Sequence, residues 1–207
     1  MIGEKEIKEA ERNIPQYLTD GLLSRDSAHA KFVPFYMNNS KLSFQLASHV
    51  FKLSSDAETK KNAGFPADME FYLWVVVTSY YSMFYAANAA LAKLGLKVAD
   101  KIPHRVTQDA LIVYFLKSKK LAKYFLEDYK ATKQEVLSVM GMSEEELLKE
   151  FQMKATELVA TFDFQRQKRG DFQYHVDLSV KQNVAQLSLE RARKFVQEIA
   201  STIEKIR

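Results

Sequence analysis

The chain has 207 residues, of which 47% are apolar and 27% are charged, a balance that supports one sizeable hydrophobic core. It contains no cysteine, which excludes disulfides, zinc–thiolate sites and cysteine catalysis. The net charge of +4 is compatible with a polyanionic partner but does not by itself indicate one. The opening stretch MIGEKEIKEAERN is charged and has no apolar run, so we expect no secretory signal and a cytoplasmic protein.

The first sixty residues are predicted to form accessory helices. Residues 4–17 are polar and charged, and Pro15 is expected to interrupt their helix. A longer helical pattern follows, and it ends in SSDAETKKNAGFP, a linker that places a boundary at residues 54–66. We therefore predict accessory helices over 1–60 and a helical core over 66–207. The apolar residues expected on the buried face of the longer helix are Phe35, Leu42, Leu46, Val50 and Leu53.

Residues 71–92, FYLWVVVTSYYSMFYAANAALA, contain no charge and must be tested as a membrane span. Their tyrosines are spread along the middle of the run, whereas interfacial tyrosines gather in belts at both ends of a span. A helix that is apolar nearly all round also suits the centre of a water-soluble bundle. We favour a buried helix, opened by Asp68 and closed by Gly95.

The remainder of the chain predicts further helices. After a loop that holds Pro103, two helices are expected over 107–118 and 120–140. A capping box at Ser143 and Glu146 opens another helix, for which Gly170 is the natural end. The last helix opens at Ser179 and is expected to bury Val184, Leu187, Phe195, Ile199, Ile203 and Ile206. With few Gly and Pro and no convincing strand pattern, the fold class is all-α, an up-and-down four-helix-bundle core with additional amino-terminal helices.

One short stretch, KRGDFQYHVD at residues 168–177, is the candidate functional site. Arg169 falls in the last turn of the helix that opens at Ser143, and His175 lies in the loop before the helix that opens at Ser179. Antiparallel neighbours joined by so short a connection would hold both side chains at one end of the bundle. Taken singly, an Arg in a last helical turn complements the helix dipole, and a loop His is usually a solvated surface residue. The residues that make the surroundings cationic and aromatic, as phosphate binding and base stacking require, are Arg166, Lys168, Phe172 and Tyr174.

The histidines restrict the chemistry of such a site. His29, His49, His104 and His175 lie far apart in the sequence with no acidic residue at ligand spacing, so we expect no metal and no cofactor. Cleavage of RNA needs neither, because the 2′-hydroxyl of the substrate attacks the neighbouring phosphate. A His with the ordinary pKa of about 6.5 can move the proton of that hydroxyl, and an Arg stabilises the charge that builds on the phosphoryl oxygens.

Two segments of the chain resemble the HEPN domains of prokaryotes and archaea. Residues 79–104 are similar to the tyrosine-rich central helix of that family and the loop after it, and residues 169–199 are similar to its final helical hairpin. Many members have an Arg, four to six intervening residues and then a His, and here five residues separate Arg169 from His175. The resemblance covers roughly residues 66–207.

The resemblance implies a helical bundle that forms a homodimer and places two Arg–His pairs in one cleft. Active HEPN proteins are metal-independent endoribonucleases, often toxins neutralised by a small nucleotidyltransferase-like antitoxin. In that role Arg169 and His175 would be catalytic, and Arg166, Lys168 and Tyr174 would position the RNA. The chain departs from the common pattern at Gly170, Phe172 and Gln173.

Two other functions are compatible with the same sequence. Some HEPN proteins lack nuclease activity and bind a nucleotide, an RNA or a partner protein as accessory modules. A scaffold assembled through residues 1–60 is the other alternative. The aromatic cluster of Tyr80, Tyr81, Phe84 and Tyr85 is expected to be core packing or a dimer interface, because aromatic side chains at helical spacing usually pack together.

Overall fold

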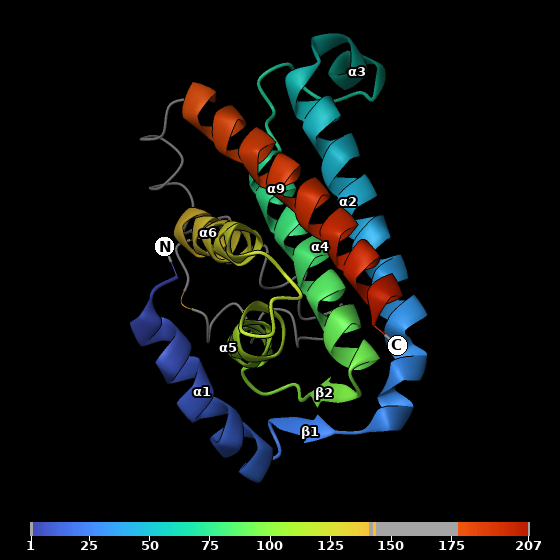
Figure 1. Cartoon of the computed structure of the whole chain (residues 1–207). Coiled ribbons are helices and arrows are strands. Elements are labelled where there is room, and N and C mark those ends of the chain that lie inside the picture. The colour runs from blue at the N-terminus through green and yellow to red at the C-terminus, as the bar shows by residue number, and fades with distance from the viewer. Residues whose placement is uncertain (1, 141–142, 144–177, 207) are drawn as a thin grey trace.

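The computed structural model describes residues 2–140, 143 and 178–206 (Figure 1). This part of the chain is mostly helical, as the sequence predicts. The helix predicted between Ser143 and Gly170 lies outside the described residues, apart from Ser143 itself.

The centre of the fold is helix α4 (Tyr72–Lys93). It packs against α2 (Val33–Ser55), α6 (Lys123–Met140) and α9 (Leu178–Lys205), as Figure 1 shows. Most of its residues are buried, including the fully enclosed Tyr80, so the prediction of a buried helix is confirmed. In the described part of the chain, no helix combines the length and hydrophobicity that crossing a membrane requires.

The ends of α4 agree only partly with the prediction. The helix begins at Tyr72, after Phe71, and not directly after Asp68. At the other end Gly95 has a φ of +67° and follows the last helical turn, as predicted. A Cβ on Gly95 would lie 3.1 Å from Cα of Ser27, so glycine is required there both for its backbone conformation and for the close approach.

The buried face of α2 was predicted only in part, since Val50 packs partly buried against the core as expected. The buried residues of α2 are Ser40, Ala47 and Ser54, whereas Phe35, Leu42 and Leu46 are 59%, 52% and 52% exposed. Small residues at an interval of seven let the backbones of α2 and α4 come close. The hydroxyl of Ser40 donates to the Ser82 carbonyl at 2.8 Å, and the hydroxyl of Ser82 donates to the Ser40 carbonyl at 2.9 Å. Apolar spacing alone could not reveal this choice, because both faces of α2 have a helical repeat.

Helix α1 (Glu4–Thr19) continues through Pro15, contrary to the expected interruption. Pro15 lies on the exposed side of the helix, where water can solvate the carbonyl that loses its helical partner. The opposite side of α1 buries Ala10, Ile14 and Tyr17 beside α5 (Pro103–Leu111). Pro103 occupies the first turn of α5, where its missing N–H does no harm, so the predicted loop already contains the start of this helix.

Shorter elements complete the described chain. Strands β1 (Leu23–Arg25) and β2 (Leu96–Val98) form an antiparallel pair, with Leu23 opposite Val98. The sequence prediction missed them because three-residue strands are too short to show an alternating pattern. The predicted linker contains a one-and-a-half-turn helix, α3 (Ala57–Asn62), which is capped by the side chain of Asp56. The remaining elements are the 3₁₀ helix η1 (Ser27–Phe32) and the π-helix η2 (Ile112–Leu116).

Helix α9 begins one residue before the predicted Ser179. Phe195 and Ile199 are fully buried as predicted, whereas Leu187 is 43% exposed, contrary to prediction. One continuous cluster of buried residues joins side chains from both sides of the predicted boundary at 54–66, for example Tyr17 and Ala47 with Tyr80 and Phe195.

Candidate functional site

The residues predicted to form the site lie outside the described part of the chain. They are Arg166, Lys168, Arg169, Tyr174 and His175, in the segment between α6 and α9. At the start of α9, Lys181 Nζ lies 3.8 Å from Glu70 Oε2, just before α4. The segment therefore leads into a helix whose beginning lies beside the beginning of α4.

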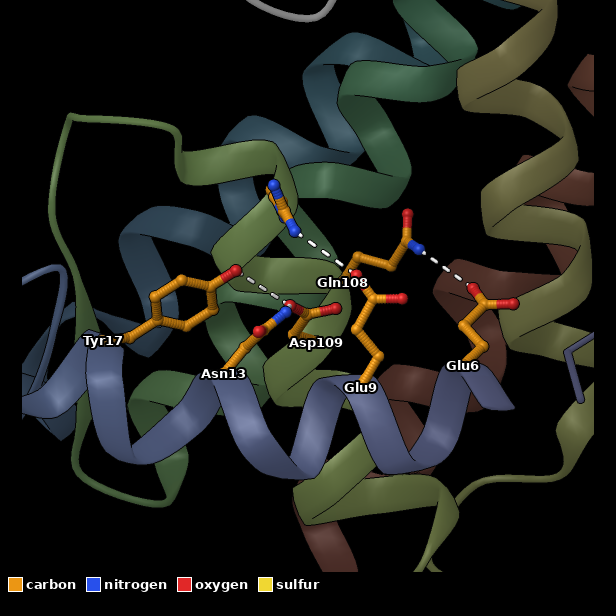
Figure 2. Close-up of polar contacts among 7 residues, drawn as sticks. Glu6, Glu9, Asn13, Tyr17, Gln108 and Asp109 are labelled. Carbon is orange, nitrogen blue, oxygen red and sulfur yellow. Dashed lines mark hydrogen bonds and ion pairs between the residues drawn. The ribbon is translucent and has the colours of Figure 1, made fainter. Parts of the chain in front are cut away.

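Among the described residues, polar side chains gather in a pocket between α1, α5 and α6. Figure 2 shows Asn13 and Tyr17 of α1 pointing toward Asp109 of α5, with Glu6 of α1 beside Gln108. The pocket has a volume of about 680 Å³, within the range of roughly 300–1,000 Å³ that small-molecule sites occupy. It is lined by Gly3, Lys5, Glu6, Glu9, Asn13, Arg105, Gln108, Asp109, Lys130 and Lys133.

The floor of this pocket is the buried carboxylate of Asp109. Its Oδ2 atom accepts hydrogen bonds from Asn13 Nδ2 and from the Tyr17 hydroxyl, both at 2.9 Å. Burial raises the pKa of the Asp109 carboxyl, and the two hydrogen bonds offset part of that rise. Burial, together with the neighbouring Asp109 charge, also raises the pKa of the Tyr17 phenol. Tyr17 is therefore a neutral hydrogen-bond donor at physiological pH.

The rim of the pocket consists of ion pairs between α1 and the two other helices. Lys130 Nζ lies 2.8 Å from Glu6 Oε2, and Arg105 lies 3.5 Å from Glu9. Gln108 Nε2 donates to the other oxygen of Glu6 at 3.2 Å. These pairs are partly exposed, so each contributes little to stability, but they are also accessible to a ligand that competes for the cations.

The pocket joins four cationic residues, Lys5, Arg105, Lys130 and Lys133, to three carboxylates. Amine and guanidinium groups bind phosphate oxygens, and carboxylates accept hydrogen bonds from the N–H groups of a nucleobase. Within the described residues, no group of His, Asp or Glu could hold a metal ion. The sequence reasoning missed Asn13, Tyr17 and Asp109. Asn13 and Tyr17 lie four residues apart and so share a helix face, but nothing in the sequence pairs that face with Asp109.

His104 belongs to a second polar cluster, which is inside the core. Its Nδ1 atom lies 2.8 Å from the Tyr80 hydroxyl, which in turn lies 3.4 Å from the hydroxyl of Tyr129. The ring of Phe84 packs against the imidazole in a tilted arrangement, with centroids 4.4 Å apart, and His104 is only 3% exposed. The prediction that the aromatic cluster packs in the core is confirmed at Tyr80. The same burial keeps His104 out of reach of a large substrate.

Comparison of the chain with protein families, with curated proteins and with solved structures finds no match.

Proposed function

We propose that this chain is a HEPN-like metal-independent endoribonuclease. The observation that carries the proposal is the pair of Arg169 and His175, separated by five residues and followed directly by α9, in a chain whose tyrosine-rich segment resembles the central HEPN helix. The burial of that segment in α4, with α6 and α9 packed on it, supports the proposal. In this proposal α4, α6 and α9, together with residues 141–177, form the HEPN-like bundle.

The reaction requires one proton acceptor and one stabilising cation. His175 takes the proton from the 2′-hydroxyl as that oxygen attacks the adjacent phosphorus. The bond from phosphorus to the 5′-oxygen breaks, and that oxygen leaves with a proton from an acid such as the imidazolium of a second copy. Arg169 neutralises the charge on the phosphoryl oxygens, while Arg166, Lys168 and Tyr174 hold the flanking RNA. The products carry a 2′,3′-cyclic phosphate and a 5′-hydroxyl.

The test is cleavage of RNA by the purified chain in excess chelator. We expect wild type to cleave, and we expect Arg169→Ala and His175→Ala each to lower the rate by at least about a hundredfold, the scale of a lost general base or charge stabiliser. Arg12→Ala removes an exposed arginine on α1 and should leave the rate unchanged. Failure of folded wild type to cleave any RNA, or full cleavage by His175→Ala, would refute the nuclease.

The pocket between α1, α5 and α6 favours a second candidate, a non-catalytic module that binds a nucleotide. A fluorescent ATP analogue titrated into the chain tests it. If the module binds through this pocket, Lys130→Gln should weaken binding about tenfold or more, since a charge-assisted hydrogen bond contributes roughly 1.5–3 kcal/mol. Lys41→Gln, an exposed lysine on α2, is the matched control and should bind normally. Equal affinities for wild type and both variants would exclude the pocket as the site.

A further inference from the structure

Another pocket lies where the strands β1 and β2 meet η2, at the end of the molecule where α4 ends (Figure 1). Its volume is about 640 Å³, within the range of roughly 300–1,000 Å³ that small-molecule sites occupy. Three segments line it, namely residues 25–27, residues 94–96 and residues of the stretch 113–120. None of these described residues also lines the pocket between α1, α5 and α6, so the two pockets are separate.

Two of the three walls are fixed to each other by backbone contacts. The N–H of Asp26 donates to the carbonyl of Gly95 at 2.7 Å, and Arg25 lies opposite Leu96 in the β1–β2 pair. The close approach of Gly95 to Ser27 leaves no space for a side chain between them. This side of the pocket is therefore formed before any ligand binds, which lowers the entropic cost of binding.

The third wall combines two rare backbone conformations. The π-helix η2 is of a kind that occurs mostly as single turns, frequently at functional sites. Lys119 has a φ of +56°, which is unfavourable for a residue with a long side chain. The hydroxyl of Ser118 donates to the Tyr114 carbonyl at 2.6 Å. The N–H of Lys120 donates to the Phe115 carbonyl at 2.9 Å. These bonds hold the turn that brings Tyr114 and Lys120 to the same pocket.

The charges of the pocket favour an anion. Arg25 and Lys120 both line it, and within the described residues neither makes an ion pair. The nearby Lys117 and Lys123, in contrast, each pair with a glutamate. Asp26 is the one acid among the described lining residues, and its carboxylate accepts from the backbone of η1 at 3.0 Å. Two cations against one acid leave the lining with a positive charge that a ligand can neutralise.

The number of cations and the wall beside them indicate which anion fits. A phosphate monoester carries about two negative charges at pH 7, one for each cation, whereas a carboxylate carries only one. The guanidinium of Arg25 can also bind two phosphate oxygens at once. Next to the cations lie the half-buried side chains of Leu94, Val113 and Tyr114. An apolar surface that includes an aromatic ring binds another ring by packing against it.

We propose that the pocket between the β1–β2 pair and η2 binds a small phosphate monoester that carries an aromatic ring. Arg25 and Lys120 hold the phosphate, and Tyr114 packs against the ring. The inference does not depend on the ribonuclease proposal, and it concerns residues other than those of the pocket between α1, α5 and α6.

Calorimetric titration of the full chain with phenyl phosphate at pH 7 tests the site. We expect wild type to bind with a Kd of about 1 mM or tighter. Arg25→Gln and Lys120→Gln should each weaken binding about tenfold or more, the usual effect of losing a charge-assisted hydrogen bond. Both residues are exposed, so neither substitution should disturb folding. Asp26→Asn keeps an acceptor for η1 but removes the repelling charge, so it should tighten binding.

Two control variants distinguish this pocket from other cations of the chain. Lys41→Gln removes an exposed lysine of α2 and should bind phenyl phosphate normally. Lys130→Gln alters the pocket between α1, α5 and α6 and should also bind it normally. No binding by folded wild type, or equal affinity of wild type, Arg25→Gln and Lys120→Gln, overturns the proposal. Binding that is lost in Lys130→Gln instead would overturn it as well.

Two further probes test the class of ligand. Benzoate has the ring but one negative charge, and inorganic phosphate has the charge but no ring, so each should bind about tenfold more weakly than phenyl phosphate. Tyr114→Leu should reduce the advantage of phenyl phosphate over inorganic phosphate and leave the affinity for inorganic phosphate unchanged. Benzoate that binds as tightly as phenyl phosphate would refute the phosphate assignment, and an unchanged advantage in Tyr114→Leu would refute the role of the ring.

Discussion

At the scale of the residue, the described chain concentrates its polar chemistry on a few buried groups. Asp109 is 7% exposed and is held by two neutral donors from α1, Asn13 and Tyr17. The positive charge of Arg105 lowers the pKa of this carboxyl, but by less than burial raises it. A buried carboxylate with neutral partners retains a large desolvation penalty, which is why its pKa is raised.

Asp109→Asn is expected to flatten the pH dependence of stability. Because the pKa of Asp109 is raised in the folded state, the folded chain binds this proton more readily than the unfolded chain. The contribution to the free energy of unfolding therefore falls as pH rises from about 3.9, the unfolded value, through the raised folded pKa. The amide oxygen of the variant can still accept from Asn13 and Tyr17, so the variant should be at least as stable as wild type at pH 7.

Urea unfolding at pH 5 and pH 7 measures this effect as the difference between wild type and variant. Glu4→Gln, which removes an exposed acid from α1, is the control and should not change the slope with pH. A variant that is less stable than wild type at both pH values would mean that the negative charge itself holds α1 in place.

Tyr80→Phe is expected to destabilise the fold by about 1–2 kcal/mol. The substitution keeps the ring but removes the hydroxyl that meets the buried His104 Nδ1 at 2.8 Å, and a lost partner of a buried polar atom carries a cost of that order. The midpoint of thermal unfolding measures the change. Tyr124→Phe, at a tyrosine that is 54% exposed, should shift the midpoint very little, and equal shifts for both would contradict the role given to the Tyr80 hydroxyl.

At the scale of the element, the contact between α2 and α4 depends on small side chains. Ala47 has no exposed surface, and the reciprocal hydrogen bonds of Ser40 and Ser82 hold the two backbones together nearby. Such a contact leaves no space for additional methylene groups, because protein interiors are close-packed.

Ala47→Leu is therefore expected to destabilise the chain by about 1–3 kcal/mol, the usual effect of overpacking. Gln45→Leu adds an apolar side chain of the same size two residues away, on the exposed side of α2, and should leave the stability of the monomer nearly unchanged. Chemical unfolding of both variants gives the comparison. If Ala47→Leu were as stable as wild type, α2 would not be packed against α4 in the way described.

At the scale of the whole molecule, the predicted accessory region and the predicted core share one buried cluster. Tyr17 and Ala47 from the first sixty residues belong to the same cluster as Tyr80 and Phe195. Helix α2 lies along α4 and also contacts α9, where Arg193 stands 5.9 Å from the ring of Phe44.

A chain reduced to residues 66–207 is therefore expected to lose cooperative folding. Without α1 and α2, the apolar faces of α4 and α5 that these helices cover would be exposed to water, at about 25 cal/mol for each Å². The full chain should unfold in one transition that is identical by circular dichroism and by fluorescence of its single tryptophan, Trp74. A sharp transition in the shortened chain would show instead that residues 66–207 form an independent domain.

The sequence by itself determined the helical class, the burial of the uncharged run at 71–92, its end at Gly95, and the bounds of α6 and α9 to within three residues. These features depend on local signals. Periodicity, caps and helix-ending glycines act within a few residues, so they can be read directly from the sequence. The catalytic role of Arg169 and His175 was likewise inferred from the sequence, and it stays a prediction.

Only the tertiary structure decided which face of α2 is buried, that Asp109 meets Asn13 and Tyr17, and that His104 is enclosed by Tyr80 and Phe84. Each of these depends on which helices become neighbours. Asn13 and Asp109, 96 positions apart, acquire their hydrogen bond from that choice, and Asp109 also acquires its burial and its raised pKa. A periodic pattern has two faces, and the free energy of packing the whole chain selects between them.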